Sequence, residues 1–136
     1  MINKVRTQQS IFGQPIYGLV GEINDPSKMS KASIAADVMD PSKRIQIWRS
    51  YGMKKVFHEY IQITTDPKVY TNDCSLFVYP IHVAWRNGMP KQDLIDVLYW
   101  LQVYSNEYSP EALKRYGPYQ RMMRSIASKP PIIPYS

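Results

Sequence analysis

The placement of proline constrains the fold of this chain more than any other sequence feature. Eleven of the 136 residues are proline, and four of them follow an Asp or a Ser, at Asp25-Pro26, Asp40-Pro41, Asp66-Pro67 and Ser109-Pro110. An Asp or Ser side chain accepts a hydrogen bond from the first turn of a helix, and proline lacks only an N–H that this turn leaves unpaired. Each pair is therefore a signal for the start of a helix.

The start signals and the apolar spacing between them predict an all-α fold in one domain. The predicted helices cover 26–39, 41–63, 76–88 with a kink at Pro80, 90–104, and 110–127 with a break at Gly117-Pro118. A strand over 76–83 is the main alternative for the third segment, but Pro80 would remove a ladder donor from its centre. The repeat of DPSK at 25–28 and 40–43 is a repeated start signal, because the residues that follow it differ.

Both ends of the chain predict extended structure. In residues 1–24, Gly13, Pro15, Gly18 and Gly21 interrupt the apolar residues too often for a helix, which predicts an extended N-terminal arm. KPPIIPYS at the C-terminus is typical of a polyproline-like tail. The domain therefore divides into the arm 1–24, basic helices 25–64, and a C-terminal helical bundle with its tail, 65–136.

Positive charge points to an acidic partner. Lys and Arg number 17 against 11 Asp and Glu, which gives a formal net charge of +6. The isoelectric point near 9.4 is typical of nucleic-acid-binding domains, although a solvated basic surface accounts for the same value.

The first basic run lies in the N-terminal half and contains no acid between residues 41 and 55. On a helix over 41–63, Lys43, Arg44, Lys54 and Lys55 share one face, where cations can contact a phosphate backbone. The alternative is an ordinary solvated helix face. The candidate nucleic-acid-binding residues are Lys4, Arg6, Lys28, Lys31, Lys43, Arg44, Arg49, Tyr51, Lys54 and Lys55.

A second acid-free run lies near the C-terminus and contains Lys114, Arg115, Arg121, Arg124 and Lys129. Arg121 and Arg124 are three residues apart and therefore neighbours on a helix. These cations suit the same polyanion or the acids of an adjacent subunit, and the sequence does not separate the two.

The predicted helix 90–104 is apolar around nearly its whole circumference. Such a helix is buried on all sides, and a small bundle leaves part of it for another subunit to cover. A central bundle helix is the equally weighted alternative. The candidate subunit-interface residues are Leu94, Leu98, Trp100, Leu101 and Tyr104.

Catalytic and cofactor chemistry has little support in the sequence. His58, His82 and Cys74 are too widely spaced for a metal site, and glycine patterns that cradle phosphate are missing. One cysteine cannot form an intramolecular disulfide, and no apolar run is long enough for a spanning helix. We therefore expect no enzyme, cofactor or metal; an enzyme that uses Cys74 and His82 is a remote alternative.

Two stretches of the chain resemble parts of a known protein family: they are DPSKRIQIWRSYGMKKV at 40–56 and LQVYSNEYSPEALKRYG at 101–117. Both are similar to the major capsid proteins of rod-shaped and filamentous linear double-stranded DNA viruses of archaea, the adnavirus group. The resemblance implies a helical subunit whose N-terminal arm and helices wrap A-form DNA while a C-terminal bundle faces outward. It implies backbone contacts from Arg44, Lys54 and Lys55, with Tyr51 as a helper. It also implies pairing with itself or a related capsid protein, in a virion assembled in the host cytoplasm.

The leading hypothesis is therefore a non-enzymatic virion structural protein that coats double-stranded DNA without reading its sequence and polymerises into a helical filament. The alternative is a small helical interaction or regulatory module whose basic face binds an acidic protein partner.

Overall fold

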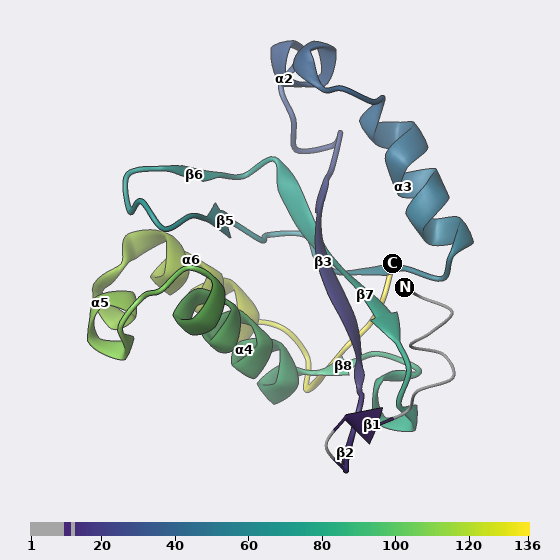
Figure 1. Cartoon of the computed structure of the whole chain (residues 1–136), viewed down its shortest axis with the longest axis vertical. Helices are drawn as coiled ribbons and strands as arrows, with labels where there is room; N and C mark the ends of the chain where they lie inside the picture. Colours follow the sequence, from purple (N-terminus) through teal and green to yellow (C-terminus); the bar gives the residue numbers. More distant parts are fainter. Residues whose placement is uncertain (1–9, 12) are drawn as a thin grey trace.

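A three-stranded antiparallel sheet lies at the centre of the molecule (Figure 1). The computed structural model describes residues 10–11 and 13–136. The sheet has the order β3 (Gly18–Asn24), β7 (Cys74–Pro80) and β4 (Lys54–Phe57), with β7 in the centre. All seven residues of β3 pair with β7, whereas the β4 pairing contains a bulge between Lys55 and Phe57.

The other elements are helices and short strand pairs. The helices are α2 (Lys31–Ala36), α3 (Pro41–Ser50), the 3-10 helix η1 (Val83–Trp85), α4 (Lys91–Trp100), the π-helical turn η2 (Leu101–Ser105), α5 (Pro110–Arg115) and α6 (Gly117–Ala127). Three antiparallel pairs join β1 (Ser10–Ile11) to β2 (Gln14–Pro15), β5 (Gln62–Ile63) to β6 (Tyr70–Thr71), and β8 (Met89–Pro90) to β9 (Ile132–Ile133).

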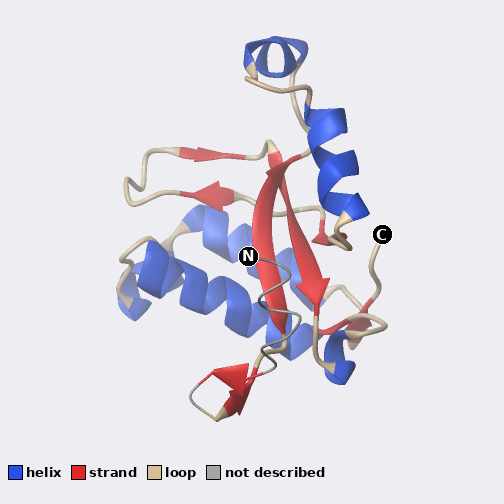
Figure 2. Cartoon of the chain, turned by 45° about the vertical axis from the view of Figure 1, so that its right-hand side comes forward, coloured by secondary structure: helices blue, strands red, loops and turns tan. Residues whose placement is uncertain are grey.

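Helices cover both faces of the sheet: α3 lies on one side, and α4 with α6 lies on the other (Figures 1 and 2). The α3 side is closed by a small cluster around Ile23, Met53 and Phe77. The larger core, which includes Leu76 and Val78, lies on the α4 side. Because β7 is covered on both faces, its residues from Cys74 to Val78 are all buried.

The sheet contradicts the predicted all-α fold. The segment predicted as a kinked helix over 76–88 is instead the central strand β7 followed by η1. Pro80 is compatible with this strand because it is the last residue of β7. By the alternation of an antiparallel ladder, the nitrogen of Pro80 points toward β4. The pairing of β4 with β7 ends at Lys54 and Val78, so no residue of β4 lies opposite Pro80. The ladder therefore keeps all its donors, and Pro80 does not exclude a strand here.

The predicted long helix over 41–63 ends much earlier, because α3 stops at Ser50. Gly52 then has a φ of +97°, in the left-handed region that favours glycine, and a side-chain Cβ there would lie 2.8 Å from Tyr79 Cε2. The turn sends residues 54–57 back along β7 as β4. Lys54 and Lys55 therefore do not share a helix face with Lys43 and Arg44.

Only two of the four proline signals begin helices. Asp40 and Ser109 accept hydrogen bonds from Ser42 N and Ala112 N at the starts of α3 and α5, as predicted. At Asp25 and Asp66, the same side-chain chemistry closes turns, with Ser27 N and Lys68 N as the donors. The predicted helix 26–39 is accordingly reduced to α2.

The predicted arm 1–24 is corrected for residues 18–24, because β3 belongs to the central sheet, whereas residues 1–9 and 12 of the arm lie outside the described residues. Other expectations are confirmed. Helix α4 and the turn η2 cover 91–105, the helix that begins at Pro110 breaks at Gly117-Pro118, and the C-terminal tail is extended.

Candidate functional site: basic surfaces and the groove along β3

Lys28 is a structural cation. Its Nζ donates to the carbonyl oxygens of His58 at 2.6 Å and Tyr60 at 2.8 Å, and also to that of Cys74. Burial lowers the pKa of this amine. Because three main-chain acceptors hold the ammonium group, Lys28 joins the turn after β3 to the segments around β4 and β7.

Lys55 is paired with a buried carboxylate. Its Nζ lies 2.6 Å from Asp25 Oδ2, and Asp25 is only 2% exposed. Burial alone would raise the pKa of Asp25, but hydrogen bonds from Lys55, Ser27 and Ser75 outweigh this effect and hold the pKa below its usual value. This pair fixes the turn after β3 to β4.

Arg44 forms a bidentate pair with Asp37, at 2.7 Å between Nη2 and Oδ1 and 3.0 Å between Nη1 and Oδ2. Asn24 Nδ2 donates to the same carboxylate at 2.9 Å. Hydrogen bonds from Arg44 and Asn24 hold the pKa of Asp37 below its usual range. Lys28, Arg44 and Lys55, which were all predicted to contact DNA, therefore have partners within the chain.

The other predicted contacts lie at the surface or outside the described residues, and Lys4 and Arg6 belong to the latter. The guanidinium of Arg49 donates to Ser136 O at 3.1 Å, and Lys54 Nζ lies 5.5 Å from the centroid of the Tyr135 ring. We call the exposed cations Lys31, Lys43, Arg49 and Lys54 the N-terminal basic surface; Tyr51 is also exposed.

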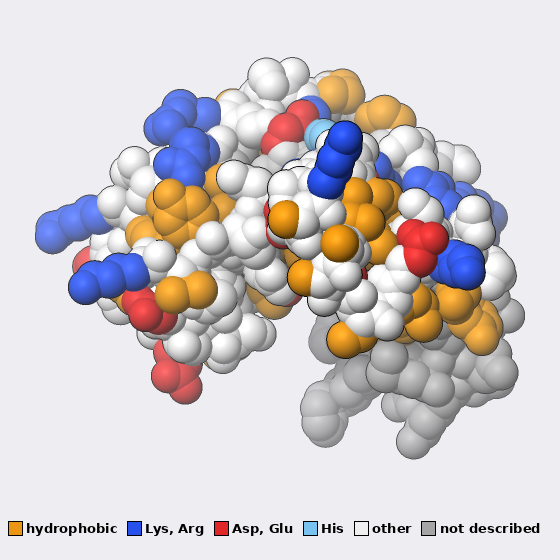
Figure 3. Space-filling view, turned by 90° about the horizontal axis from the view of Figure 1, so that it is seen from above, with side chains coloured by type: hydrophobic (Ala, Val, Ile, Leu, Met, Phe, Trp, Pro, Cys, Tyr) orange, Lys and Arg blue, Asp and Glu red, His pale blue; other side chains and the backbone are white. Residues whose placement is uncertain are grey.

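A second group of cations lies on the opposite side of the molecule, over α5, α6 and the turn between β5 and β6 (Figure 3). None of the ion pairs within residues 10–11 and 13–136 includes any of these five side chains. We call this group the C-terminal basic surface: Lys68, Lys114, Arg115, Arg121 and Arg124.

The cations of helix α6 are exposed at the surface because its apolar residues lie on the opposite face, which packs against the core. Pro118, Tyr119, Met122 and Ile126 are buried, whereas Arg121 and Arg124 are exposed. The Arg121 guanidinium lies 5.6 Å from the centroid of Tyr70, a ring that is 44% exposed.

The β5–β6 turn is fixed to the helices beside it. The Tyr116 hydroxyl donates to Pro67 O at 2.6 Å, next to Lys68. Asp66 and Glu111 are the acids on these same segments, and both are exposed. The C-terminal basic surface therefore combines three segments and keeps an excess of positive charge.

The residues predicted to form a subunit interface divide between core and surface. Leu94 and Leu98 are fully buried in this chain's own core, and Leu101 is partly buried. Trp100 and Tyr104 are 48% and 75% exposed, and their rings stack at 5.1 Å. The sheet and α6 therefore cover most of the apolar circumference of α4.

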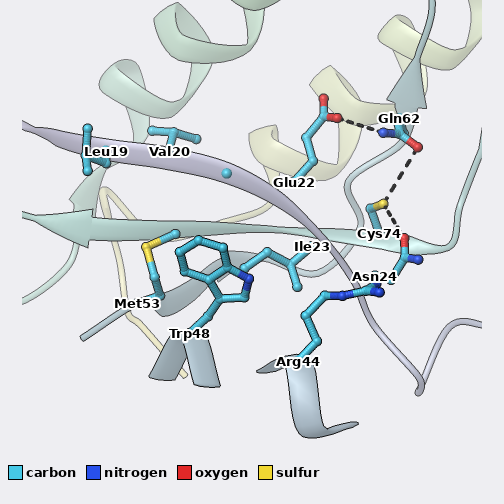
Figure 4. A pocket seen from close by; sticks show the side chains of 11 residues that line it. Leu19, Val20, Glu22, Ile23, Asn24, Arg44, Trp48, Met53, Gln62 and Cys74 are labelled. Carbon is cyan, nitrogen blue, oxygen red and sulfur yellow. Dashed lines mark hydrogen bonds between the residues drawn. The ribbon is translucent and has the colours of Figure 1, made fainter. Parts of the chain in front are cut away.

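A groove follows β3 on the α3 side, and the sequence reasoning missed it (Figure 4). Trp48 and Met53 form its apolar wall, and its other lining residues are Leu19, Val20, Gly21, Glu22, Ile23, Asn24, Arg44, Gln62 and Cys74. A second hollow on the opposite side of β3 is lined in part by Val97 and Leu101. The sequence signal for this groove was the apolar run GLVGEI at 18–23, which forms most of β3. Its two glycines made a strand difficult to predict.

Hydrogen bonds fix the polar side chains beside β3. Glu22 accepts from the Tyr60 hydroxyl and from Gln62 Nε2, the latter at 2.8 Å. The Cys74 thiol donates to Asn24 Oδ1 at 3.1 Å. Burial raises the pKa of this thiol to about 11, which disfavours the thiolate that a nucleophilic cysteine requires.

Within the part of the chain that the structure describes, no group of three or more His, Cys, Asp or Glu could hold a metal ion. No helix there is both long and apolar enough to cross a membrane. Comparison with known protein families, with curated proteins and with solved structures finds no match for this chain.

Proposed function

We propose that the protein binds double-stranded DNA through the phosphate backbone, as a non-enzymatic coating protein, and that the C-terminal basic surface makes the main contact. The observation that carries the proposal is that five exposed cations from three segments lie together without an ion-pair partner in the described chain. Such cations suit a polyanion, because each phosphate they neutralise releases condensed counterions.

The chemistry of this surface suits phosphate oxygens. Arg121 and Arg124 are neighbours on the exposed face of α6, and each guanidinium can donate two parallel hydrogen bonds to a phosphate. The Tyr70 ring beneath Arg121 favours a defined orientation of that group. Contacts of this kind do not read base sequence, so the proposed binding is sequence-independent.

This proposal differs from the hypothesis based on sequence in its location and its basis. The resemblance implied a helical subunit, and the central sheet contradicts that fold. Four of the N-terminal candidates also have hydrogen-bond partners within the chain: Lys28, Arg44, Arg49 and Lys55. DNA coating is therefore proposed from exposed charge, and the N-terminal basic surface is the competing location.

The test compares two variants that each lack three positive charges. The first replaces Lys114, Arg121 and Arg124 with Ala, and the second replaces Lys43, Arg49 and Lys54 with Ala. Binding to a duplex of random sequence is measured at several salt concentrations. Log affinity falls as log salt rises. We expect the first variant to make this fall less steep, by about 0.9 in slope for each phosphate that the protein no longer neutralises. The second variant should reduce the steepness less.

Two outcomes would contradict the proposal. A reduced slope only in the second variant would place the DNA on the N-terminal basic surface. Failure of the wild type to bind duplex at low salt, together with binding to polyglutamate, would favour the acidic protein partner instead. Circular dichroism of both variants checks that the fold is retained.

A further inference from the structure

The two edges of the central sheet are protected very differently. At the β4 edge, Lys55 and Ser136 exchange both main-chain hydrogen bonds, at 2.9 and 3.0 Å. A bulge and the exposed Lys54 lie on the same strand. These are devices by which proteins prevent pairing at an open edge. β3 has seven residues in an unbroken ladder with β7 and contains no Lys, Pro or bulge.

Alternate residues of β3 direct their main-chain groups away from β7. Ile81 N donates to Tyr17 O at one end of the ladder, and Asp25 N donates to Asp73 O at the other, so the odd-numbered residues bond to β7. By the alternation of an antiparallel ladder, the main-chain groups of Gly18, Val20, Glu22 and Asn24 point outward. No main-chain hydrogen bond within residues 10–11 and 13–136 reaches this outer edge.

We propose that a second copy of this chain pairs with this edge, β3 against β3 and antiparallel, across a two-fold axis at Gly21. The two three-stranded sheets then form one six-stranded sheet. A two-fold axis is the usual symmetry of a protein dimer and makes the contact self-complementary.

The register follows from the strand itself. An axis at Gly21 pairs Gly18 with Asn24 and Val20 with Glu22 of the other copy, so every outward main-chain group of β3 has a partner. An axis at Glu22 would place two carboxylates directly opposite each other, which is unfavourable. An axis at Val20 would leave Asn24 unpaired. Only the Gly21 axis uses the full length of β3.

The side chains beside the edge are compatible with this pairing. Glu22 accepts hydrogen bonds from Tyr60 and Gln62 of its own chain, and its carboxylate lies beside Gln62 (Figure 4). On the α3 side, Leu19 would face Ile23 of the other copy, which places apolar residues together. The hollows on both sides of β3 provide room for the side chains of an added strand.

The first test is the molar mass in solution, measured by light scattering after size exclusion. We expect a dimer for the wild type. Val20→Pro removes an outward N–H but no bond to β7, so we expect this variant to be monomeric and folded. Val20→Ala, which keeps the N–H, is the matched control and should remain a dimer.

A second test does not depend on whether the proline variant folds. At the proposed axis, the two Gly21 residues form a non-hydrogen-bonded pair with Cα atoms about 4.5 Å apart, within reach of a disulfide. A Cβ at Gly21 would meet only Met53 Cε at 3.5 Å, an ordinary contact. Gly21→Cys should therefore oxidise to a covalent dimer, whereas Ala35→Cys, on α2, should not.

A monomeric wild type that gives no Gly21→Cys dimer would overturn the proposal. A wild-type dimer that withstands Val20→Pro, with no cross-link at Gly21→Cys, would place the interface elsewhere and also overturn it.

Discussion

At the scale of single residues, several charged side chains of the N-terminal half stabilise the fold through partners within the chain. Asp25 is the centre of this arrangement, because it accepts from Lys55, Ser27 and Ser75 while almost fully buried. Removing one partner of a buried pair leaves an uncompensated charge, which costs far more than an exposed pair contributes.

We predict that Asp25→Asn lowers the free energy of unfolding at pH 7 by about 3 kcal/mol. Because the pKa of Asp25 is lowered in the folded protein, its contribution is fully present above the ordinary carboxyl pKa near 4 and is lost as the pH falls below it. Urea unfolding should show that the wild type loses more stability than the variant between pH 5 and pH 3. Glu111→Gln, at an exposed acid, should behave like the wild type.

The sequence showed the position of these charges but not their partners. Asp25 and Lys55 are 30 residues apart, and they come together only because β3 and β4 both pair with β7. The acceptors of Lys28 are main-chain carbonyls, which no pattern of side chains reveals. An acid-free run therefore predicted exposed charge along 41–55, whereas Arg44 and Lys55 are paired with acids outside it.

At the scale of elements, α4, α5 and α6 were predictable because the prolines at their starts and their apolar spacing agree with their tertiary setting. The strands were not, because the Asp-Pro pairs at Asp25 and Asp66 close turns with the chemistry that starts a helix at Asp40. The groove was missed with them, since it exists only once β3 has paired with β7.

Gly52 is the residue that separates α3 from β4, and a matched pair of glycine substitutions tests this role. Gly52→Ala introduces a Cβ at positive φ, 2.8 Å from the Tyr79 ring, and should lower stability by about 1–3 kcal/mol. Gly117→Ala adds the same methyl at the start of α6, where the nearest atom is Arg121 Nη1 at 3.8 Å, and should be neutral or mildly stabilising. Equal melting temperatures for the two variants would contradict this account.

At the scale of the whole molecule, the two proposals concern different parts of the protein. The open edge of β3 belongs to the central sheet, whereas the C-terminal basic surface lies on α5, α6 and the β5–β6 turn. A dimer through β3 therefore carries two copies of that surface, and a duplex long enough to reach both is bound at two sites. Linked binding of this kind raises the overall affinity without any new contact.

We therefore predict that wild-type protein binds a duplex of about 40 base pairs at least tenfold more tightly than one of about 10 base pairs, after correction for the number of sites. Val20→Pro should remove this preference and leave the affinity for the short duplex unchanged, because its cations are intact. Fluorescence anisotropy with both duplexes measures the four affinities. If the folded Val20→Pro variant binds the short duplex more weakly than the wild type does, the β3 edge itself touches DNA. If the variant keeps the preference for the long duplex, dimerisation and DNA binding are independent.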